Sequence, residues 1–325
     1  MKKQLPFFSA LIAVFLFTGC AFNISLIPSV RPFEEKVIEG EGDAKILVMD
    51  ISGTLSFSEE VGGSRLRAGV PKVANFTEAL RKAEKDEKIK GLIIRINSPG
   101  GTVASSDVFH HEIKRFKEKK KIPVYAHIVE VGASGAYYAA GAADKIYISP
   151  AAITGSIGVL AMKFNVQGLM GKIGVEDEVY KSADKKDFWS PLRPSTPEEK
   201  EMLQGIINGL YERFLDIVYE GRRQVLSREE VKALADGRIF TAGEALELKL
   251  VDGVGHLDES IEEMKKASGI KEAKIVVYQR PGSYKSTIYS ELSDITPGAE
   301  AGLLALAARE LEFMGEVKFF YLWNP

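Results

Sequence analysis

Residues 127–160 read HIVEVGASGAYYAAGAADKIYISPAAITGSIGVL, and this stretch decides the fold that we predict. An apolar run over 124–129 is typical of a buried strand, and Gly132 interrupts it. The small residues over 136–143 then favour a closely packed helix. Ser134 lies where this helix begins, and there free backbone N–H groups and the positive end of the helix dipole favour developing negative charge. We therefore interpret Ser134 as a candidate nucleophile.

A second interpretation of Ser134 is purely structural. Serine is among the preferred residues at the N-cap of a helix, where its hydroxyl accepts a hydrogen bond from a backbone N–H group. This window alone favours the capping role, so the rest of the chain must distinguish the two interpretations.

The composition is that of an ordinary globular protein. The chain has 325 residues, of which 45% are hydrophobic, and this length allows one large core or two smaller ones. Its 43 Lys and Arg residues nearly balance its 45 Asp and Glu residues. Without a basic field or a stacked pattern of aromatic and arginine residues, the chain is not typical of nucleic-acid binders. We expect no nucleic-acid partner.

The amino end has the layout of an export signal. Two lysines precede an apolar run over 7–17, and this run is shorter than the about 20 residues that a helix needs to cross a membrane. The run continues into Phe17-Thr18-Gly19-Cys20, which resembles the lipobox of a bacterial lipoprotein. Cys20 would then be the lipidated first residue, and it is the only cysteine in the chain. The alternative is an uncleaved membrane anchor.

Apolar runs and helical patterns alternate along most of the remaining chain. Apolar runs predict strands over 45–51, 91–96, 123–129, 144–149 and 274–279. Helical spacing predicts helices over 73–83 and 108–116, and a long helix that begins with a capping box between Thr196 and Glu199. Two shorter helices begin with capping boxes at Ser227 and Thr241. This alternation indicates an α/β fold with a mostly parallel sheet and right-handed crossovers.

The turn Asn97-Ser98-Pro99-Gly100-Gly101 follows the second predicted strand. Paired glycines permit positive φ angles and the close approach of another chain, so the Gly101 amide could donate a hydrogen bond to an oxyanion. An ordinary turn has the same composition, and the motif is informative only together with Ser134.

Five motifs resemble those of the signal peptide peptidase A family, a family of membrane-associated bacterial serine proteases, and they follow one another along the chain in the same order as in that family. The motifs are the Ser134 window, NSPGG at 97–101, ADKIYISP at 143–150, TGSIGV at 154–159 and KKDFWSP at 185–191. The likeness covers roughly residues 45–269. It implies an α/β, caseinolytic-protease/crotonase-like core with parallel β-α-β units, plus a helical extension.

The resemblance implies a Ser/Lys dyad in which Ser134 attacks the peptide carbonyl and a lysine acts as general base. The family pattern is a Ser-Gly pair, two variable residues and Lys-Asp, and it falls on residues 182–187. It selects Lys186. This chain has Ala183 in place of the glycine and an additional lysine, Lys185, which stays the alternative base.

The resemblance also implies roles for groups around the dyad. The Ser156 hydroxyl would hold the lysine, and the amides of Gly101 and Ser134 would donate to the oxyanion. A lysine with its ordinary pKa of about 10.4 is nearly all protonated at neutral pH, so a lysine base needs a water-poor site that lowers the pKa. Phe188 and Trp189, or a neighbouring subunit, would supply this site.

Three other functions remain open at this point. A Ser/His site would use one of the four histidines, which are His110, His111, His127 and His256. A crotonase-like acyl-thioester enzyme would explain the glycines but not the export signal. A non-catalytic membrane scaffold of the same fold is the third. With no HExxH pair and a single cysteine, we expect no metal and no cofactor.

The predicted organisation has four parts. Residues 1–20 are the signal or anchor, 21–44 a spacer, 45–270 the peptidase domain and 271–325 a C-terminal extension. In the extension we expect an amphipathic helix over 301–313, and we expect KFFYLW at 318–323 to dock on a partner or the membrane.

The family resemblance also predicts where the protein acts and on what. We expect an endopeptidase of the bacterial cell envelope, anchored to the membrane with its catalytic domain on the extracytoplasmic side. Its substrates would be signal-peptide remnants and other extended hydrophobic peptides. Its protomers would assemble into a ring-like homo-oligomer in which adjacent chains complete each active site.

Overall fold

The computed structural model describes residues 31–57, 70–280, 288 and 319–323. The predicted signal or anchor segment with Cys20 lies outside these residues, and so does the helix predicted over 301–313. None of the helices in the described ranges is long and apolar enough to cross a membrane.

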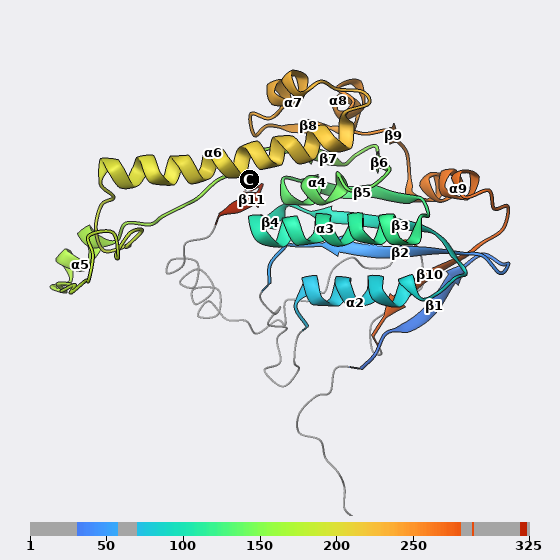
Figure 1. Ribbon diagram of the computed structural model, residues 1–325, viewed down its shortest axis with the longest axis horizontal. Coiled ribbons are helices and arrows are strands. Elements are labelled where there is room, and N and C mark those ends of the chain that lie inside the picture. The colour runs from blue at the N-terminus through green and yellow to red at the C-terminus, as the bar shows by residue number, and fades with distance from the viewer. Residues whose placement is uncertain (1–30, 58–69, 281–287, 289–318, 324–325) are drawn as a thin grey trace, which may run out of the picture.

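The described residues contain one sheet of nine strands, in which seven follow the order β1-β10-β2-β3-β5-β6-β9 (Figure 1). These are β1 (Glu34–Glu39), β2 (Lys45–Ser52), β3 (Ile89–Ser98), β5 (Val124–Ala133), β6 (Lys145–Ile148), β9 (Gly253–Val254) and β10 (Lys274–Gln279). The strands from β10 to β9 are parallel, whereas β1 runs antiparallel to β10. The predicted α/β class is confirmed.

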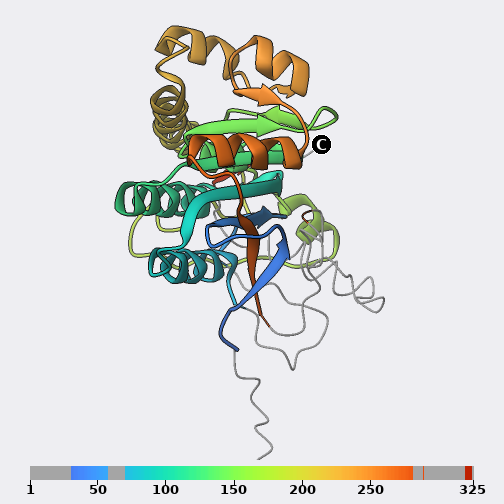
Figure 2. The same ribbon diagram turned by 90° about the vertical axis from the view of Figure 1, so that its right-hand side faces the viewer.

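Helices cover both faces of this sheet, which is why its central strands β2, β3 and β5 are mostly buried and apolar. The first face carries α2 (Lys72–Glu84), α3 (Val103–Lys120) and α4 (Gly135–Ala140), and the other carries α9 (Leu257–Ala267) (Figure 2). Alternate side chains of β2 pack on opposite faces of the sheet, because side chains alternate in direction along a strand. Leu47 and Met49 pack in the larger cluster, and Ile46 and Val48 pack with Leu257 in the smaller one.

The sheet extends beyond the boundaries that the sequence predicted for the peptidase domain. Strand β1 lies in the predicted spacer and pairs with β10, which lies in the predicted C-terminal extension. Strand β10 in turn pairs with β2. The edge of the sheet therefore joins residues from both flanking segments.

Two further strands extend the sheet beside β5. Strand β7 (Ile153–Gly155) runs parallel to β5, and β8 (Ile239–Thr241) runs antiparallel to β7. Two short helices flank β8 in the chain, α7 (Arg228–Leu234) and α8 (Ala242–Glu247). Both begin with the predicted capping boxes.

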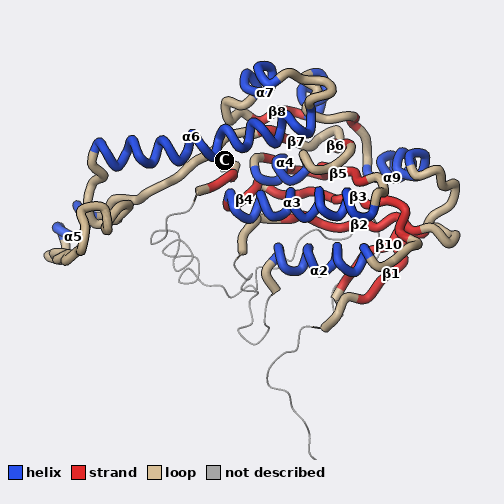
Figure 3. Tube along the Cα trace, in the orientation of Figure 1, coloured by secondary structure: helices blue, strands red, loops and turns tan. Residues whose placement is uncertain are grey.

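A long excursion leaves the sheet after β7, and we call residues 161–196 the arm. The arm contains α5 (Gln167–Lys172) and leads into α6 (Pro197–Arg222), which starts with the predicted capping box. The arm projects away from the sheet, and α6 runs back over it (Figures 1 and 3). At 1.5 Å per residue, α6 is about 39 Å long.

The two halves of α6 have different surroundings. Phe214, Leu215, Ile217 and Val218 in its second half are buried against the core, whereas Glu199 is the only buried residue of its first half. The apolar face predicted over 203–217 is therefore covered at one end only. The uncovered end lies beside the arm.

The last described strand, β11 (Phe320–Leu322), pairs antiparallel with β4 (Gly100–Thr102). Phe320 also exchanges two backbone hydrogen bonds with Leu160, of 3.0 and 3.1 Å. Tyr321 is fully buried, and its ring stacks on Tyr138 and tilts against Phe214. The expectation that KFFYLW docks on a partner or the membrane is therefore wrong for β11, because its backbone and its central ring are satisfied within the chain.

Candidate active site

Ser134 joins the end of β5 to the start of α4 in a strained conformation. Its φ of 54° and ψ of −118° are sparsely populated by residues other than glycine. The side chain makes no capping hydrogen bond, and the residue is 1% exposed. The capping interpretation is therefore wrong, and the strained turn needs support from its surroundings.

Strand β7 supplies this support and brings Ser156 beside Ser134. The Ser134 amide donates a 2.8 Å hydrogen bond to the carbonyl oxygen of Gly155, which lies opposite Ala133 in the pairing of β5 with β7. Ser156 follows with a φ of 50° and is almost buried, and its own amide donates to the Arg238 carbonyl oxygen at 2.7 Å. Two of the predicted site residues thus meet at adjacent strand ends.

Gly101 presents its backbone to the edge of β4 that β11 occupies. Leu55 holds the opposite edge, since it donates to the Gly100 carbonyl oxygen at 2.8 Å and accepts from the Thr102 amide at 2.9 Å. Backbone groups of successive residues alternate between the two edges of a strand, so the Gly101 amide faces Tyr321. The predicted oxyanion donor therefore lies along a strand-binding edge.

The second predicted oxyanion donor, the Ser134 amide, is already engaged with Gly155. The amide of Gly135 is better placed, because a Cβ atom built on Gly100 would lie 2.7 Å from the Gly135 nitrogen and 2.1 Å from the Tyr321 carbonyl oxygen. Sequence reasoning missed Gly135. The signal was available, since the residue after a nucleophilic serine commonly donates its amide to the oxyanion.

Strand β11 lies beside these groups. On one side it pairs with β4, and on the other Phe320 bonds to Leu160. Its Tyr321 side chain rests on Tyr138, whose hydroxyl donates to Asp107 at 2.6 Å. The site thus accepts an extended antiparallel strand with a large aromatic side chain below it.

The three predicted lysines lie in the arm and differ in their partners. Lys181 pairs with Asp187 at 2.9 Å, and Lys185 pairs with Glu198. Lys186 is exposed, and its ammonium group has no hydrogen bond or ion pair with any described residue. The arm that carries Lys186 projects away from the sheet (Figure 1), and no hydrogen bond joins Lys186 to Ser134 among the described residues. Phe188 and Trp189 beside it are half-buried, with ring centroids 6.3 Å apart.

Sequence reasoning also missed Lys163, which joins the two sides of the arm. Its ammonium group donates to the Arg193 carbonyl oxygen and to the Ser195 hydroxyl, both at 3.0 Å. Burial, and then the charge of Arg193, lowers the pKa of Lys163. No local pattern marks this lysine, because its partners are about 30 positions further along the chain.

The histidines do not take part in the site that the structure forms. His127 is fully buried, and its ring nitrogens contact the hydroxyls of Ser260 at 2.8 Å and Ser149 at 3.1 Å. His110 packs edge-on against the Tyr138 ring. Within the described part of the chain, no histidine hydrogen bonds to Ser134. The same residues contain no group of three or more His, Cys, Asp or Glu side chains arranged to hold a metal ion.

Comparison with known proteins identifies the family. Residues 116–271 match the model of peptidase family S49. The chain is 34% identical over 247 residues to a protein of Enterococcus faecium named signal peptide peptidase SppA, covering 76% of this chain and 70% of that protein. It is 30% identical over 290 residues to the protease MJ0651 of Methanocaldococcus jannaschii, covering 88% and 91%. Among solved structures, it is similar to the membrane-bound stomatin-specific protease 1510-N, with a TM-score of 0.43 and 14% identity over 69% of this chain and 86% of that one. The chain therefore belongs to the signal peptide peptidase A family of serine proteases, peptidase family S49.

Proposed function

We propose that this serine protease is an endopeptidase in which Ser134 is the nucleophile and Lys186 the general base. Its substrates are cleaved signal peptides and other extended hydrophobic peptides. One observation carries the proposal most strongly. Ser134 has a positive φ and no capping bond, and it lies beside a β4 edge that accepts an antiparallel strand. Such an edge is suited to hold a peptide extended across a nucleophile.

The pairing of β11 supports an extended mode of substrate binding. A peptide in the place of β11 gains backbone hydrogen bonds on two sides, from the β4 edge and from Leu160. It also brings a side chain over Tyr138, as Tyr321 does. The amides of Gly101 and Gly135 then flank the carbonyl that Ser134 attacks, and they stabilise the negative charge that develops on its oxygen.

The ion pairs of Lys181 and Lys185 support Lys186 as the base. A lysine can accept a proton only in its neutral form, and an ion pair with a carboxylate favours the charged form. Lys181 and Lys185 each have such a partner, whereas Lys186 has none among the described residues. Of the three lysines that the family pattern brings into question, Lys181, Lys185 and Lys186, Lys186 is therefore the one best suited to proton transfer.

We place the meeting of Lys186 and Ser134 at a contact between two copies of the chain. The arm and the first half of α6 expose many large apolar side chains, which are Met162, Phe164, Leu169, Ile173, Val175, Val179, Tyr180, Met202 and Ile206. Large exposed apolar patches mark protein or membrane interaction sites. A second copy that covers the arm would remove water from Lys186, which a lysine base requires. The active form is then a homo-oligomer.

The location of the protein is proposed from its amino end. Lys2, Lys3, the apolar run and Cys20 support an export signal with a lipid anchor. The catalytic domain then lies on the extracytoplasmic side of the bacterial membrane, where signal-peptide remnants remain after export.

Covalent labelling with a serine-directed fluorophosphonate tests the proposal. We expect the adduct on the peptide that contains Ser134, and loss of both the adduct and the cleavage of a synthetic signal peptide in Ser134→Ala. Lys186→Ala should abolish cleavage with the fold intact by circular dichroism. Cleavage retained in Ser134→Ala would overturn the assignment. An unlabelled protein without peptidase activity would instead favour a scaffold.

A further inference from the structure

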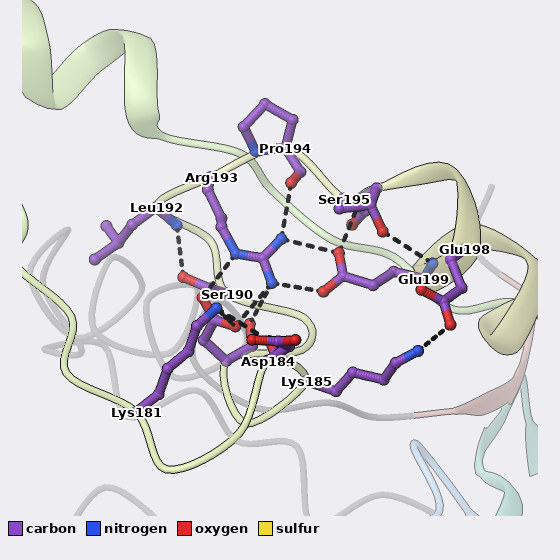
Figure 4. A network of polar contacts seen from close by, with 12 residues as sticks. Lys181, Asp184, Lys185, Ser190, Leu192, Arg193, Pro194, Ser195, Glu198 and Glu199 are labelled. Atoms are coloured by element: carbon purple, nitrogen blue, oxygen red, sulfur yellow. Dashed lines mark hydrogen bonds and ion pairs between the residues drawn. The ribbon is translucent and has the colours of Figure 1, made fainter.

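Arg193 lies between two carboxylates at the end of the arm that leads into α6, and Figure 4 shows its guanidinium group. It donates to both oxygens of Asp187, from Nε at 2.8 Å and from Nη2 at 2.9 Å. It also donates to both oxygens of Glu199, at 2.9 and 2.5 Å. The three side chains are only 25%, 13% and 5% exposed, in the order Arg193, Asp187 and Glu199. This is a bidentate bridge on each side, the geometry that arginine makes best.

The bridge joins the turn that carries Lys186 to the start of α6. Asp187 follows Lys186 directly in a tight turn, in which the Lys186 amide donates to the Ala183 carbonyl oxygen at 3.0 Å. Glu199 closes the capping box of α6, since its carboxylate accepts from the Thr196 amide at 2.9 Å. The far half of α6 is buried in the core. A continuous set of bonds therefore runs from the core to the residue next to Lys186.

The two carboxylates of the bridge stay charged at every pH at which a lysine base would act. Hydrogen bonds from Arg193, then from Lys181, hold the pKa of Asp187 well below its usual range. The hydrogen bond from Arg193, then that from the Thr196 amide, lowers the pKa of Glu199 to about 2. Both carboxylates are thus ionised at neutral and alkaline pH. The Asp187 carboxylate is occupied by two cations and does not pair with Lys186.

A second contact stabilises the same corner of the arm. Lys163 donates hydrogen bonds to the backbone carbonyl of Arg193 and to the side chain of Ser195. These bonds connect the segment of the arm that leaves the sheet with the segment that leads into α6. This contact holds the backbone at Arg193, whose side chain bonds to Asp187 next to Lys186.

We propose that Arg193 is a positioning residue that holds the turn of Lys186 in place for proton transfer with Ser134. This inference rests on the proposed function, in which Lys186 is the base. Arg193 touches neither the substrate nor Ser134, and it acts only through Asp187 and Glu199. Lysine cannot replace it, because one ammonium group cannot present two parallel pairs of donors to two carboxylates.

The test compares Arg193→Ala and Arg193→Lys with the unaltered protein on a synthetic signal peptide. We expect kcat to fall by about 100-fold in both, the order of loss that a misplacement of about 1 Å causes, with KM nearly unchanged. Added guanidinium chloride at low millimolar concentration should restore part of kcat in Arg193→Ala, because the ion fits the gap between the carboxylates. It should not restore Arg193→Lys, where the side chain fills that gap.

Arg228→Ala is the matched control. Arg228 also bridges two carboxylates, Glu212 at 2.9 Å and Asp216 at 2.7 Å, but no predicted site residue adjoins it. We expect its kcat to match that of the unaltered protein. Activity is measured on the fraction that elutes with the unaltered oligomer in size-exclusion chromatography.

Each outcome separates this inference from the proposed function. If Ser134→Ala and Lys186→Ala are inactive while Arg193→Ala behaves like Arg228→Ala, only the positioning role is overturned. It is also overturned if both Arg193 variants lose the oligomer, since Arg193 would then act on assembly. If Lys186→Ala keeps full activity, the proposed base is wrong whatever Arg193 does.

Discussion

The Ser134 amide donates a 2.8 Å hydrogen bond to the carbonyl oxygen of Gly155. This bond fixes the strained turn of the candidate nucleophile to the neighbouring strand β7, and it places Ser156 on the same support. It also removes the Ser134 amide from the groups that could bind an oxyanion. The geometry of the site therefore depends on how β7 is held.

Gly155→Ala should disturb this support. Gly155 has a φ of +98°, and a Cβ there would lie 2.6 Å from the Phe240 ring and 2.9 Å from the Arg238 carbonyl oxygen. We expect a loss of stability of about 1–3 kcal/mol, with a clear fall in kcat because the Ser134 turn shifts. Thermal unfolding and peptide hydrolysis measure the two effects.

Gly237→Ala is the control for Gly155→Ala. It has a similar φ of +90°, but nothing lies within 4 Å of its Cβ position. The Gly237→Ala variant has the same backbone strain but no contact like that between a Cβ at 155 and Phe240. It should therefore lose some stability and keep its kcat. Equal loss of kcat in both variants would contradict the proposed role of the Gly155 contact.

Subunit complementation tests whether the site is shared between chains. Ser134→Ala and Lys186→Ala should each be inactive alone, whereas a mixture of the two, dissociated and reassembled together, should regain part of the activity. The reason is that a chain with Ser134 intact can then receive Lys186 from its neighbour. Peptide hydrolysis before and after mixing measures the effect, and a mixture that stays inactive would place both groups of the site in one chain.

Removal of the β11 contact should free the β4 edge. In Tyr321→Ala, the ring that stacks on Tyr138 at 5.1 Å between centroids is lost, and β11 loses its buried anchor. We expect a lower KM for a hydrophobic peptide, because β11 no longer competes for the β4 edge. We also expect a lower melting temperature. An unchanged KM would mean that substrates bind elsewhere.

Acid should destabilise the fold through His127. Burial, and then the charge of His256, lowers the pKa of His127 from 6.5 to about 4. Between these values the unfolded chain binds the proton and the folded chain does not, so stability is complete above pH 6.5 and falls as the pH drops toward 4. The loss amounts to about 3 kcal/mol for this one group.

Urea unfolding at pH 7 and pH 4.5 measures this effect. His127→Gln should lower stability at pH 7, because the contacts with Ser260 and Ser149 are weakened, and should reduce the dependence on pH. A pH dependence equal to that of the unaltered protein would show that other groups cause it. His110, whose pKa is also lowered to about 4 by burial, is the first of these.

Local sequence patterns predicted most of the described core. The apolar runs became β2, β3, β5, β6 and β10, because continuous apolar residues are stable only where both faces of a strand are covered. The capping boxes at Thr196, Ser227 and Thr241 begin helices as predicted, since they satisfy backbone groups within one turn. These features depend on neighbours in the chain.

Strands β1 and β4 escaped prediction for the opposite reason. Strand β1 carries four charged residues among its six, and β4 is Gly100-Gly101-Thr102, so neither has an apolar pattern. They are strands because β10 and β11 supply hydrogen bonds from distant parts of the chain. Because these strands form by pairing with distant segments, their own residues do not predict them.

The sequence by itself determined the α/β class, the position of Ser134 between a strand and a helix, and the lysine-rich segment with Lys186. Only the tertiary structure decided that Ser134 is strained and uncapped, that its amide is engaged by Gly155, and that the arm with Lys186 projects away from the sheet. The physical reason is range. Periodicity and capping act over a few residues, whereas the site is assembled by hydrogen bonds and packing between segments that the chain brings together only when it folds.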